Sequence, residues 1–308
     1  MSIRAQEVSF QSEGVGCAAT LYRPEGVDRP LPGLIMGNGF ASVRKMYLPM
    51  YAGAFAREGV AVLTIDYRYL GESEGGPRQQ VIPEAQIADM RNAITWLSEQ
   101  PGIDPQRIAL WGTSFAGGHV LRVASHDPRV AAAVAQVPAV GLWRYLRLAS
   151  AEVRQEFLAT ALADRLAFAD SAKARMLAIT APDGAESVLG DNGYDWHRAN
   201  EERHPSFRNE IAAHSLDHIA PYDPGAFVEE ISPTPLLMIV ARQDTVTAPE
   251  VAREVYERIR EPKQLVEFDG DYYDVYDNAA TVELITDATA AFLRQHLGVG
   301  PTASARAA

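Results

Sequence analysis

The chain has 308 residues, of which 47% are hydrophobic and 22% charged, a composition that fits one large α/β domain or a domain with an insertion. Its 40 acidic and 28 basic residues give a formal charge of −12, which argues against nucleic acid or an anionic membrane as a partner. The single cysteine, Cys17, excludes an internal disulfide and a cysteine-rich metal site. The first residues lack an apolar stretch of the signal-peptide type and no run is long enough to cross a bilayer, so we expect a cytoplasmic protein.

The first half of the chain alternates between strand and helix patterns. Two short alternating segments, 8–11 and 17–22, predict a leading β-hairpin. Apolar runs and helical spacings then predict strands and helices in alternation, at 31–36, 48–57, 60–65, 84–98, 107–111, 116–125 and 130–137. Such an order implies a parallel sheet with helices on both faces, and ligands bind at the carboxyl ends of its strands.

The alternation stops between residues 139 and 228. Helical patches at 143–163 and 209–218 flank a polar, aromatic stretch around Tyr194–His197. Because this segment is too long for a simple connection, we expect a helical cap inserted over the strand ends.

The α/β pattern resumes after the cap. A buried strand at 234–240 is followed by a helix that carries Val251, Val255 and Ile259 on one face, a strand at 264–268 and a closing helix at 280–296. The predicted division is therefore an α/β core at 1–138 and 229–298, a helical cap at 139–228 and a flexible tail at 299–308.

Ser114 stands in the pattern Gly-x-Ser-x-Ala-Gly, between a strand pattern and a helix pattern. A strand that turns sharply into a helix needs small neighbours on either side of the turn residue, and Gly112 and Ala116 meet that need. Such a turn exposes the serine hydroxyl at the top of a sheet, above the N-terminal amides of the new helix. We therefore interpret Ser114 as a nucleophile.

A serine nucleophile needs a base, a group that orients the base, and amide donors for the oxyanion. In this topology the acid follows a later strand at the same sheet edge, and Asp244 comes directly after the strand at 234–240. Aspartate is also common as a turn residue or a helix N-cap. Position and topology together favour the catalytic interpretation.

Several stretches together resemble the α/β-hydrolase superfamily, specifically bacterial capped serine hydrolases of the esterase, thioesterase and dienelactone-hydrolase-like kind. The matching stretches are Gly37–Phe40, Asp66–Arg68 with Gly71 and Ser73, Gly112–Gly118 and Asp244–Thr247, with a weaker match at Gly270–Tyr276. The resemblance implies the α/β-hydrolase fold, Ser114 and Asp244 as catalytic residues, and an oxyanion hole formed by the backbone N–H groups of Phe40 and Phe115. Asp66 and Arg68 are more often structural than catalytic in such proteins.

One departure from the family pattern affects the chemistry. The loop after the last strand carries the catalytic histidine in this family, usually as Gly-x-His followed by an aromatic residue, whereas Tyr272 occupies that position here. Tyrosine has a pKa near 10 and is a poor general base at neutral pH. His296, the last histidine of the chain, is expected on the closing helix, far from this loop.

Three explanations compete. The histidine was replaced in an otherwise ordinary hydrolase; or a histidine elsewhere substitutes, for which the cap offers candidates; or the fold serves a reaction that needs no such base, with Tyr272 as acid or base. The cap candidates are His197, His204, His214 and His218. His119, just after Ser114, is expected to pack inside the helix or against the sheet.

The primary hypothesis is a serine hydrolase of an ester or thioester with a mostly apolar acyl group, in which Asp244 supports residue 272. The alternatives are a lyase, cyclase or acyltransferase on a natural-product, polyketide-like intermediate, and a binding protein without catalysis. The expected substrate-binding residues are Trp143, Tyr145, Trp196, His214 and His218. No metal, nucleotide or flavin is expected, since no dinucleotide motif or P-loop is present. Oligomeric state stays open, with a homodimer as one option.

Overall fold

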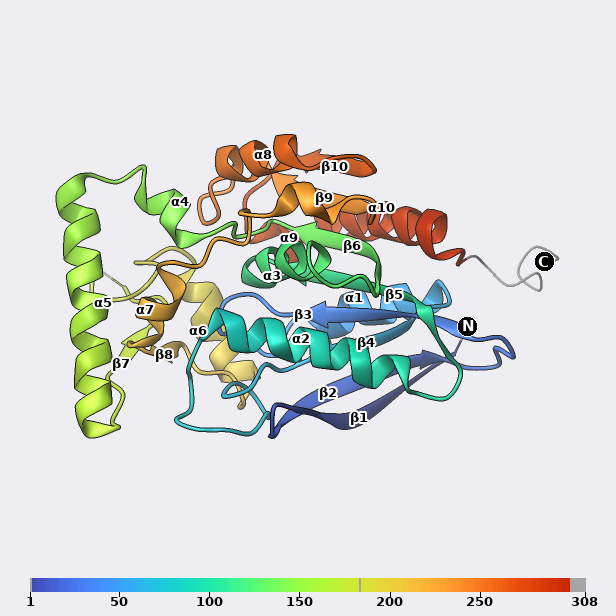
Figure 1. Ribbon diagram of the computed structural model, residues 1–308, viewed down its shortest axis with the longest axis horizontal. Helices are drawn as coiled ribbons and strands as arrows, with labels where there is room; N and C mark the ends of the chain where they lie inside the picture. Colours follow the sequence, from blue (N-terminus) through green and yellow to red (C-terminus); the bar gives the residue numbers. More distant parts are fainter. Residues whose placement is uncertain (1, 183, 300–308) are drawn as a thin grey trace.

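The computed structural model describes residues 2–182 and 184–299, and these build an eight-stranded sheet flanked by helices. Its strands lie in the order β1-β2-β4-β3-β5-β6-β9-β10 (Figure 1). Their bounds are β1 Ile3–Ser12, β2 Val15–Pro24, β3 Leu31–Gly37, β4 Ala61–Ile65, β5 Ile103–Thr113, β6 Val130–Gln136, β9 Leu236–Ala241 and β10 Lys263–Phe268. The hairpin β1–β2 joins β4 in antiparallel register, and every pairing from β4 to β10 is parallel.

The inner strands are apolar along their whole length because helices cover both faces of the sheet. All seven residues of β3 and all five of β4 are buried. On one face pack α2 (Pro83–Ser98), α3 (Phe115–Ala124) and α8 (Pro249–Arg258). On the other pack α1 (Leu48–Arg57) and α10 (Ala279–Leu297). This is the doubly wound arrangement that the alternating sequence pattern predicts.

The segment 139–228, called the inserted segment below, interrupts the alternation. Its elements are α4 Leu142–Leu146, α5 Ala151–Ser171, β7 Met176–Ala178, α6 Tyr194–Arg203, β8 Glu210–Ala212 and α7 Ser215–Ile219. Figure 1 shows them gathered at one end of the molecule. The 3-10 helix η1 (Val228–Ile231) leads back to β9, and α9 (Asp274–Asp277) lies between β10 and α10.

Two of the expected helices in this segment are wrong. The helix expected at 143–163 is two helices, because Ser150 caps a new one by accepting the N–H of Val153 at 3.3 Å. The stretch expected as a helix at 209–218 begins instead as strand β8, paired antiparallel with β7, before α7. A pairing with a distant strand overrides local helical spacing there, and short-range patterns do not reveal it.

The expected flexible tail lies outside the described residues except for Val299, which is buried in the core on the α10 face. Among the described residues, no helix has both the length and the apolar character needed to cross a bilayer.

Candidate active site

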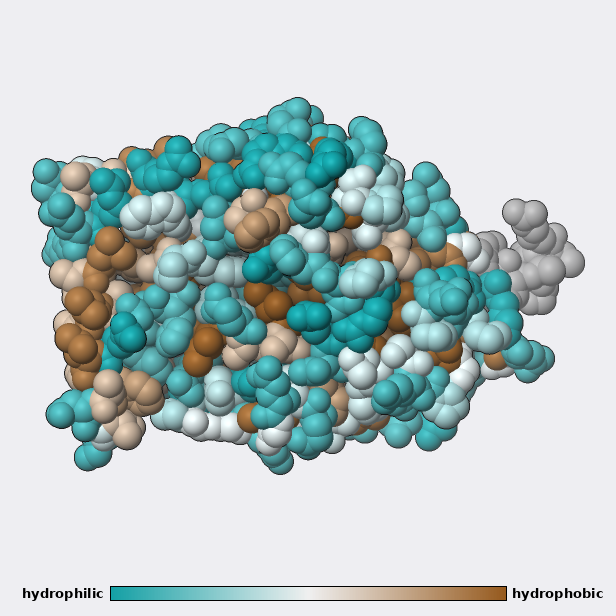
Figure 2. Space-filling view, in the orientation of Figure 1, coloured by the Kyte–Doolittle hydropathy of each residue, from teal (hydrophilic) through white to brown (hydrophobic). Residues whose placement is uncertain are grey.

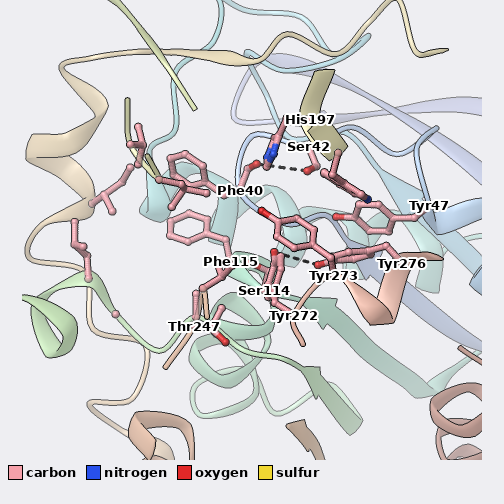
Figure 3. A pocket seen from close by; sticks show the side chains of 18 of the residues that line it. Phe40, Ser42, Tyr47, Ser114, Phe115, His197, Thr247, Tyr272, Tyr273 and Tyr276 are labelled. Carbon is pink, nitrogen blue, oxygen red and sulfur yellow. Dashed lines mark hydrogen bonds between the residues drawn. The ribbon is translucent and has the colours of Figure 1, made fainter. Parts of the chain in front are cut away.

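Ser114 occupies the turn between β5 and α3 in a backbone conformation that few residues other than glycine adopt. Its φ is +55° and its ψ is −120°. The strand and helix are so close that a Cβ on Gly112 would lie 2.2 Å from the carbonyl oxygen of Ala116. This close approach explains why a residue without a side chain stands at position 112, as the sequence pattern predicts. The turn leaves the Ser114 side chain at the wall of a cavity (Figure 3).

Two backbone N–H groups beside Ser114 lack hydrogen-bond partners. Among the described residues, the amides of Phe40 and Phe115 have no acceptor. Both rings line the same cavity, and they meet edge to face with their centroids 5.5 Å apart. Buried or half-buried N–H groups without an acceptor are rare, and here they are available to a developing oxyanion. The N–H of Gly39, the residue before Phe40, is not available in this way because it donates to the Tyr47 hydroxyl at 2.8 Å.

A buried ion pair holds the loop that carries Phe40. Asp66, at the end of β4, accepts the backbone N–H of Arg44 at 2.6 Å and that of Glu72 at 3.0 Å. The Arg44 guanidinium pairs with the same carboxylate and with Glu7. Both Arg44 and Asp66 are buried, so this pair fixes the loop relative to the sheet edge. The structural role expected for Asp66 agrees with these contacts.

Tyr272 belongs to a chain of buried hydroxyl groups that ends at Ser114. The Thr113 hydroxyl lies 3.0 Å from the Tyr276 hydroxyl, which donates to the Tyr272 hydroxyl at 3.2 Å. A further hydrogen bond joins Tyr272 to the Ser114 side chain. Burial raises the pKa of Tyr272 well above its ordinary value, and that of Tyr276 likewise. Both phenols therefore stay protonated at neutral pH, and Tyr272 is a hydrogen-bonding neighbour of Ser114 rather than a base.

Asp244 lies beyond the end of β9, at the sheet edge where the sequence places it. Its carboxylate accepts the N–H groups of Val246 at 2.7 Å and Thr247 at 2.6 Å, and the Thr247 hydroxyl at 2.6 Å. Burial raises the pKa of Asp244, and the hydrogen bonds from Thr247 partly offset this. The expected contact with residue 272 is not among the hydrogen bonds of the described residues. The carboxylate instead shapes its own loop, whose residues Val246 and Thr247 line the cavity.

The cavity has a volume of about 260 Å³ and lies between the carboxyl edge of the sheet and the inserted segment. Its walls are mostly apolar or aromatic side chains, including Leu142, Val188, Leu189, Leu216, Ile219, Trp196 and Tyr273. Such a lining suits an apolar ligand with one reacting polar group.

The structure places only some of the expected substrate-binding residues in the cavity lining. Trp196 lines the cavity, whereas Trp143 is 39% exposed and does not. His214 stacks on Phe168 with centroids 3.9 Å apart, and its Nε2 lies 3.0 Å from Gln80 Oε1, away from the cavity. Neither His214 nor His218 is part of the lining, since α7 turns Leu216 and Ile219 inward instead. The side chain of Tyr145 lies outside what the structure describes.

Two further histidines, His119 and His197, have different surroundings. His119 is fully buried, with its ring nitrogens 2.7 Å from the Tyr222 hydroxyl and 2.9 Å from Gln86 Oε1, and burial lowers its pKa to about 3. His119 is thus a core residue, as expected. His197 lines the cavity; sequence reasoning names it only as one of four candidate bases. Its apolar surroundings come from tertiary packing, which no local pattern shows.

The sequence matches a known protein family over most of its length. A family model described as X-Pro dipeptidyl-peptidase (S15 family) matches residues 13–271. The chain belongs to this family. The expected α/β-hydrolase fold is confirmed by the crystal structure of the α/β hydrolase GrgF from Penicillium sp. sh18, with a TM-score of 0.83 and 28% identity over 96% of this chain and 99% of that one.

Relatives of this S15-family chain carry several functional names. The quorum-quenching protein AidA of Acinetobacter baumannii (strain MDR-ZJ06) is 34% identical over 78% of this chain and 79% of its own length. Thiohydrolase aneE of Aspergillus aculeatus is 30% identical over 87% of this chain and 84% of its own. The polyketide transferase grgF of Penicillium sp. is 30% identical over 76% and 78%. The chain is therefore related to enzymes named for hydrolysis and for transfer.

Proposed function

We propose that this protein cleaves an ester or thioester of a mostly apolar acyl group, with Ser114 as the nucleophile. The observation that carries the proposal is the position of Ser114, in a strained turn at the cavity wall beside the two unpaired amides of Phe40 and Phe115. Removing one oxyanion donor typically costs a factor of about 10²–10³ in rate, so such a pair is a strong catalytic feature. The similarity to a thiohydrolase supports the same chemistry.

In this mechanism the acyl chain lies in the apolar cavity and its carbonyl oxygen meets the amides of Phe40 and Phe115. Ser114 Oγ attacks the carbonyl carbon and loses its proton, which is transferred to the oxygen or sulfur of the departing alcohol or thiol. Water then attacks the acyl-Ser114 ester, so that the free acid leaves and a proton returns to Ser114 Oγ. The neutral Tyr272 phenol holds the Ser114 hydroxyl in place by its hydrogen bond. Asp244 shapes the loop that contributes Val246 and Thr247 to the cavity wall.

The test compares wild type with Ser114→Ala on p-nitrophenyl esters and acyl thioesters of increasing chain length. Loss of the nucleophile should lower turnover by at least about 10³-fold, and medium-length apolar acyl groups should be preferred. Thermal unfolding of both proteins checks that the fold is intact. Equal turnover by the two proteins would refute the proposal.

A second candidate is transfer or cyclisation of a polyketide-like acyl group onto a hydroxyl of an acceptor rather than onto water. It is favoured by the similarity to a polyketide transferase and by the mostly apolar cavity, which disfavours water. Both candidates share the acyl-Ser114 intermediate. They differ in the product formed when wild type meets a thioester in the presence of an alcohol: an ester for transfer, and a free acid for hydrolysis.

A further inference from the structure

The cavity contains one group that can accept a proton near neutral pH. Among the described residues that line it, His197 is the single imidazole, and no carboxylate or amine joins it. The remaining polar groups are hydroxyls and phenols, and burial raises the pKa of Tyr47 to about 12. A serine nucleophile without a base is weak, so His197 is the side chain of this lining to consider as a base.

The ring of His197 is held in a defined orientation. Its Nδ1 lies 2.9 Å from the carbonyl oxygen of Gly193. A carbonyl only accepts, so Nδ1 carries the proton and Nε2 of the neutral ring holds a lone pair. Nε2 has no hydrogen-bond partner among the described residues. Figure 3 shows His197 and Ser114 at the wall of the same cavity, with Tyr273 between them in that view.

Two loops at the sheet edge, those that contain Thr245 and Tyr273, contact the segment that holds this ring. The Asn192 side chain donates to the carbonyl oxygen of Thr245 at 3.1 Å, next to Asp244. The Tyr273 hydroxyl donates to the carbonyl oxygen of Asn192 at 3.1 Å, next to Tyr272. Gly193 follows at once, and its carbonyl holds the imidazole. The base is thus tied to the two loops that the family pattern associates with the acid and the histidine.

We propose that His197, contributed by the inserted segment, is the general base that replaces the missing histidine of the last loop. The proposal rests on Ser114 being the nucleophile. The Ser114 Oγ–H bond breaks as the bond from Oγ to the acyl carbon forms, and the carbonyl electron pair moves onto oxygen. The proton passes through one bridging water to His197 Nε2 and then to the departing thiolate or alkoxide.

The second half of the reaction uses the same nitrogen. Nε2 takes the proton of the water or hydroxyl that attacks the acyl group, and the proton returns to Ser114 Oγ when the acyl–oxygen bond breaks. A phenol at position 272 would then serve to position Ser114. The imidazole neither forms nor breaks a covalent bond to the substrate in either half.

This role predicts a pH dependence. The groups that face the ring are Trp196, Phe207 and the Tyr273 phenol, and burial keeps that phenol neutral by raising its pKa. Burial also lowers the pKa of His197, so the base form persists to a lower pH than in a free histidine. The rate should be level at neutral pH and fall as the pH drops through this lowered pKa.

The test uses His197→Asn, because the asparagine amide can still donate to the Gly193 carbonyl while Nε2 is lost. His197→Gln is the second variant, and His204→Asn, at the end of the same helix and outside the cavity lining, is the control. Acyl turnover is measured from pH 4 to 9, with thermal unfolding to check the fold. We expect a loss of about 10²-fold in both His197 variants, disappearance of the acidic limb, and no change in the control.

A rescue experiment separates a base from a structural residue. Adding Tyr272→His to His197→Asn should restore turnover, because an imidazole then stands directly beside Ser114. Wild-type turnover in both His197 variants, with Ser114→Ala inactive, would overturn this inference alone. Full turnover in Ser114→Ala would instead refute the proposed function. A loss in the His197 variants that Tyr272→His does not restore, with the acidic limb retained, would also overturn the inference.

The outer side of α5 is apolar and exposed to solvent. Leu158, Leu162 and Leu166 are 38%, 46% and 60% exposed there. Figure 2 shows this brown patch over α5. Arg154 and Asp170, which flank the leucines, lie on different sides of the helix, so the patch itself indicates no particular partner.

Discussion

The sheet edge and the inserted segment contribute to one cavity by different means. At the sheet edge, Ser114 and the loop of Phe40 are held by backbone geometry and by the buried Arg44–Asp66 pair. The inserted segment places Trp196 and His197 through side-chain contacts with loops of the sheet. Ser114 is thus fixed by the fold itself, whereas the opposite wall depends on a few contacts at Asn192 and Gly193.

The two regions should differ most in how much stability is lost when one of their ion pairs is broken. Arg44→Met leaves the buried carboxylate of Asp66 without its partner, so the free energy of unfolding should fall by about 3–5 kcal/mol. Arg175→Met in the inserted segment breaks pairs in which the arginine is 41% exposed, and the loss should stay within about 1 kcal/mol. Urea denaturation measures both. Equal losses would show that the Arg44 and Arg175 ion pairs do not differ in their contribution to stability.

Gly193 lies in close contact with Tyr273, a residue of the loop after β10. Its φ is +76°, and an added Cβ would lie 1.8 Å from the Tyr273 hydroxyl. Gly193→Ala should therefore displace the contact and cost about 1–3 kcal/mol of stability, with a loss of acyl turnover. Gly190→Ala has a similar φ of +65° but open space around its Cβ. Turnover should be unchanged in that control, and comparable turnover in the two variants would argue against a coupling at Gly193.

Tyr272→His tests whether the sheet edge still holds a working site. An imidazole beside Ser114 would supply a directly placed base, so ester hydrolysis should rise by about 10-fold or more. Tyr272→Phe removes the hydroxyl contact without adding a base and should give no gain. A rise of the same size in both variants would show that loss of the phenol, rather than the new base, is responsible.

The smallest effect is expected at the contact between the two regions. Tyr273→Phe deletes the hydrogen bond to the carbonyl oxygen of Asn192 and leaves the ring in place. We expect a loss of about 1 kcal/mol in stability and a modest fall in turnover. Calorimetry and steady-state kinetics measure the two quantities. Tyr69→Phe, outside the cavity lining, is the matched control.

Sequence reasoning succeeds where structure follows from neighbouring residues. The alternating elements from β3 to β6, the turn at Ser114 and the place of Asp244 all follow from local spacing and strand order. The strand β8 could not be predicted, since its partner β7 is distant in sequence. The break before α5 follows instead from a local N-cap at Ser150, a signal that the helical spacing across 143–163 outweighed.

The site was predicted unevenly for the same reason. Ser114, Phe40 and Phe115 lie where the motif places them, whereas His214 and His218 do not line the cavity. The position of His197 depends on contacts with loops about fifty and eighty residues further along the chain. No periodicity within α6 encodes such contacts.

The most direct test of the central claim is to trap the acyl group on the protein. Wild type and Ser114→Ala are treated with a fluorophosphonate and, separately, with an apolar acyl thioester, quenched in acid and examined by intact mass and peptide mapping. The account predicts one added group on wild type, carried by the peptide that contains Ser114, and none on Ser114→Ala. Turnover of the thioester without any such adduct, or an adduct that persists in Ser114→Ala, would contradict it.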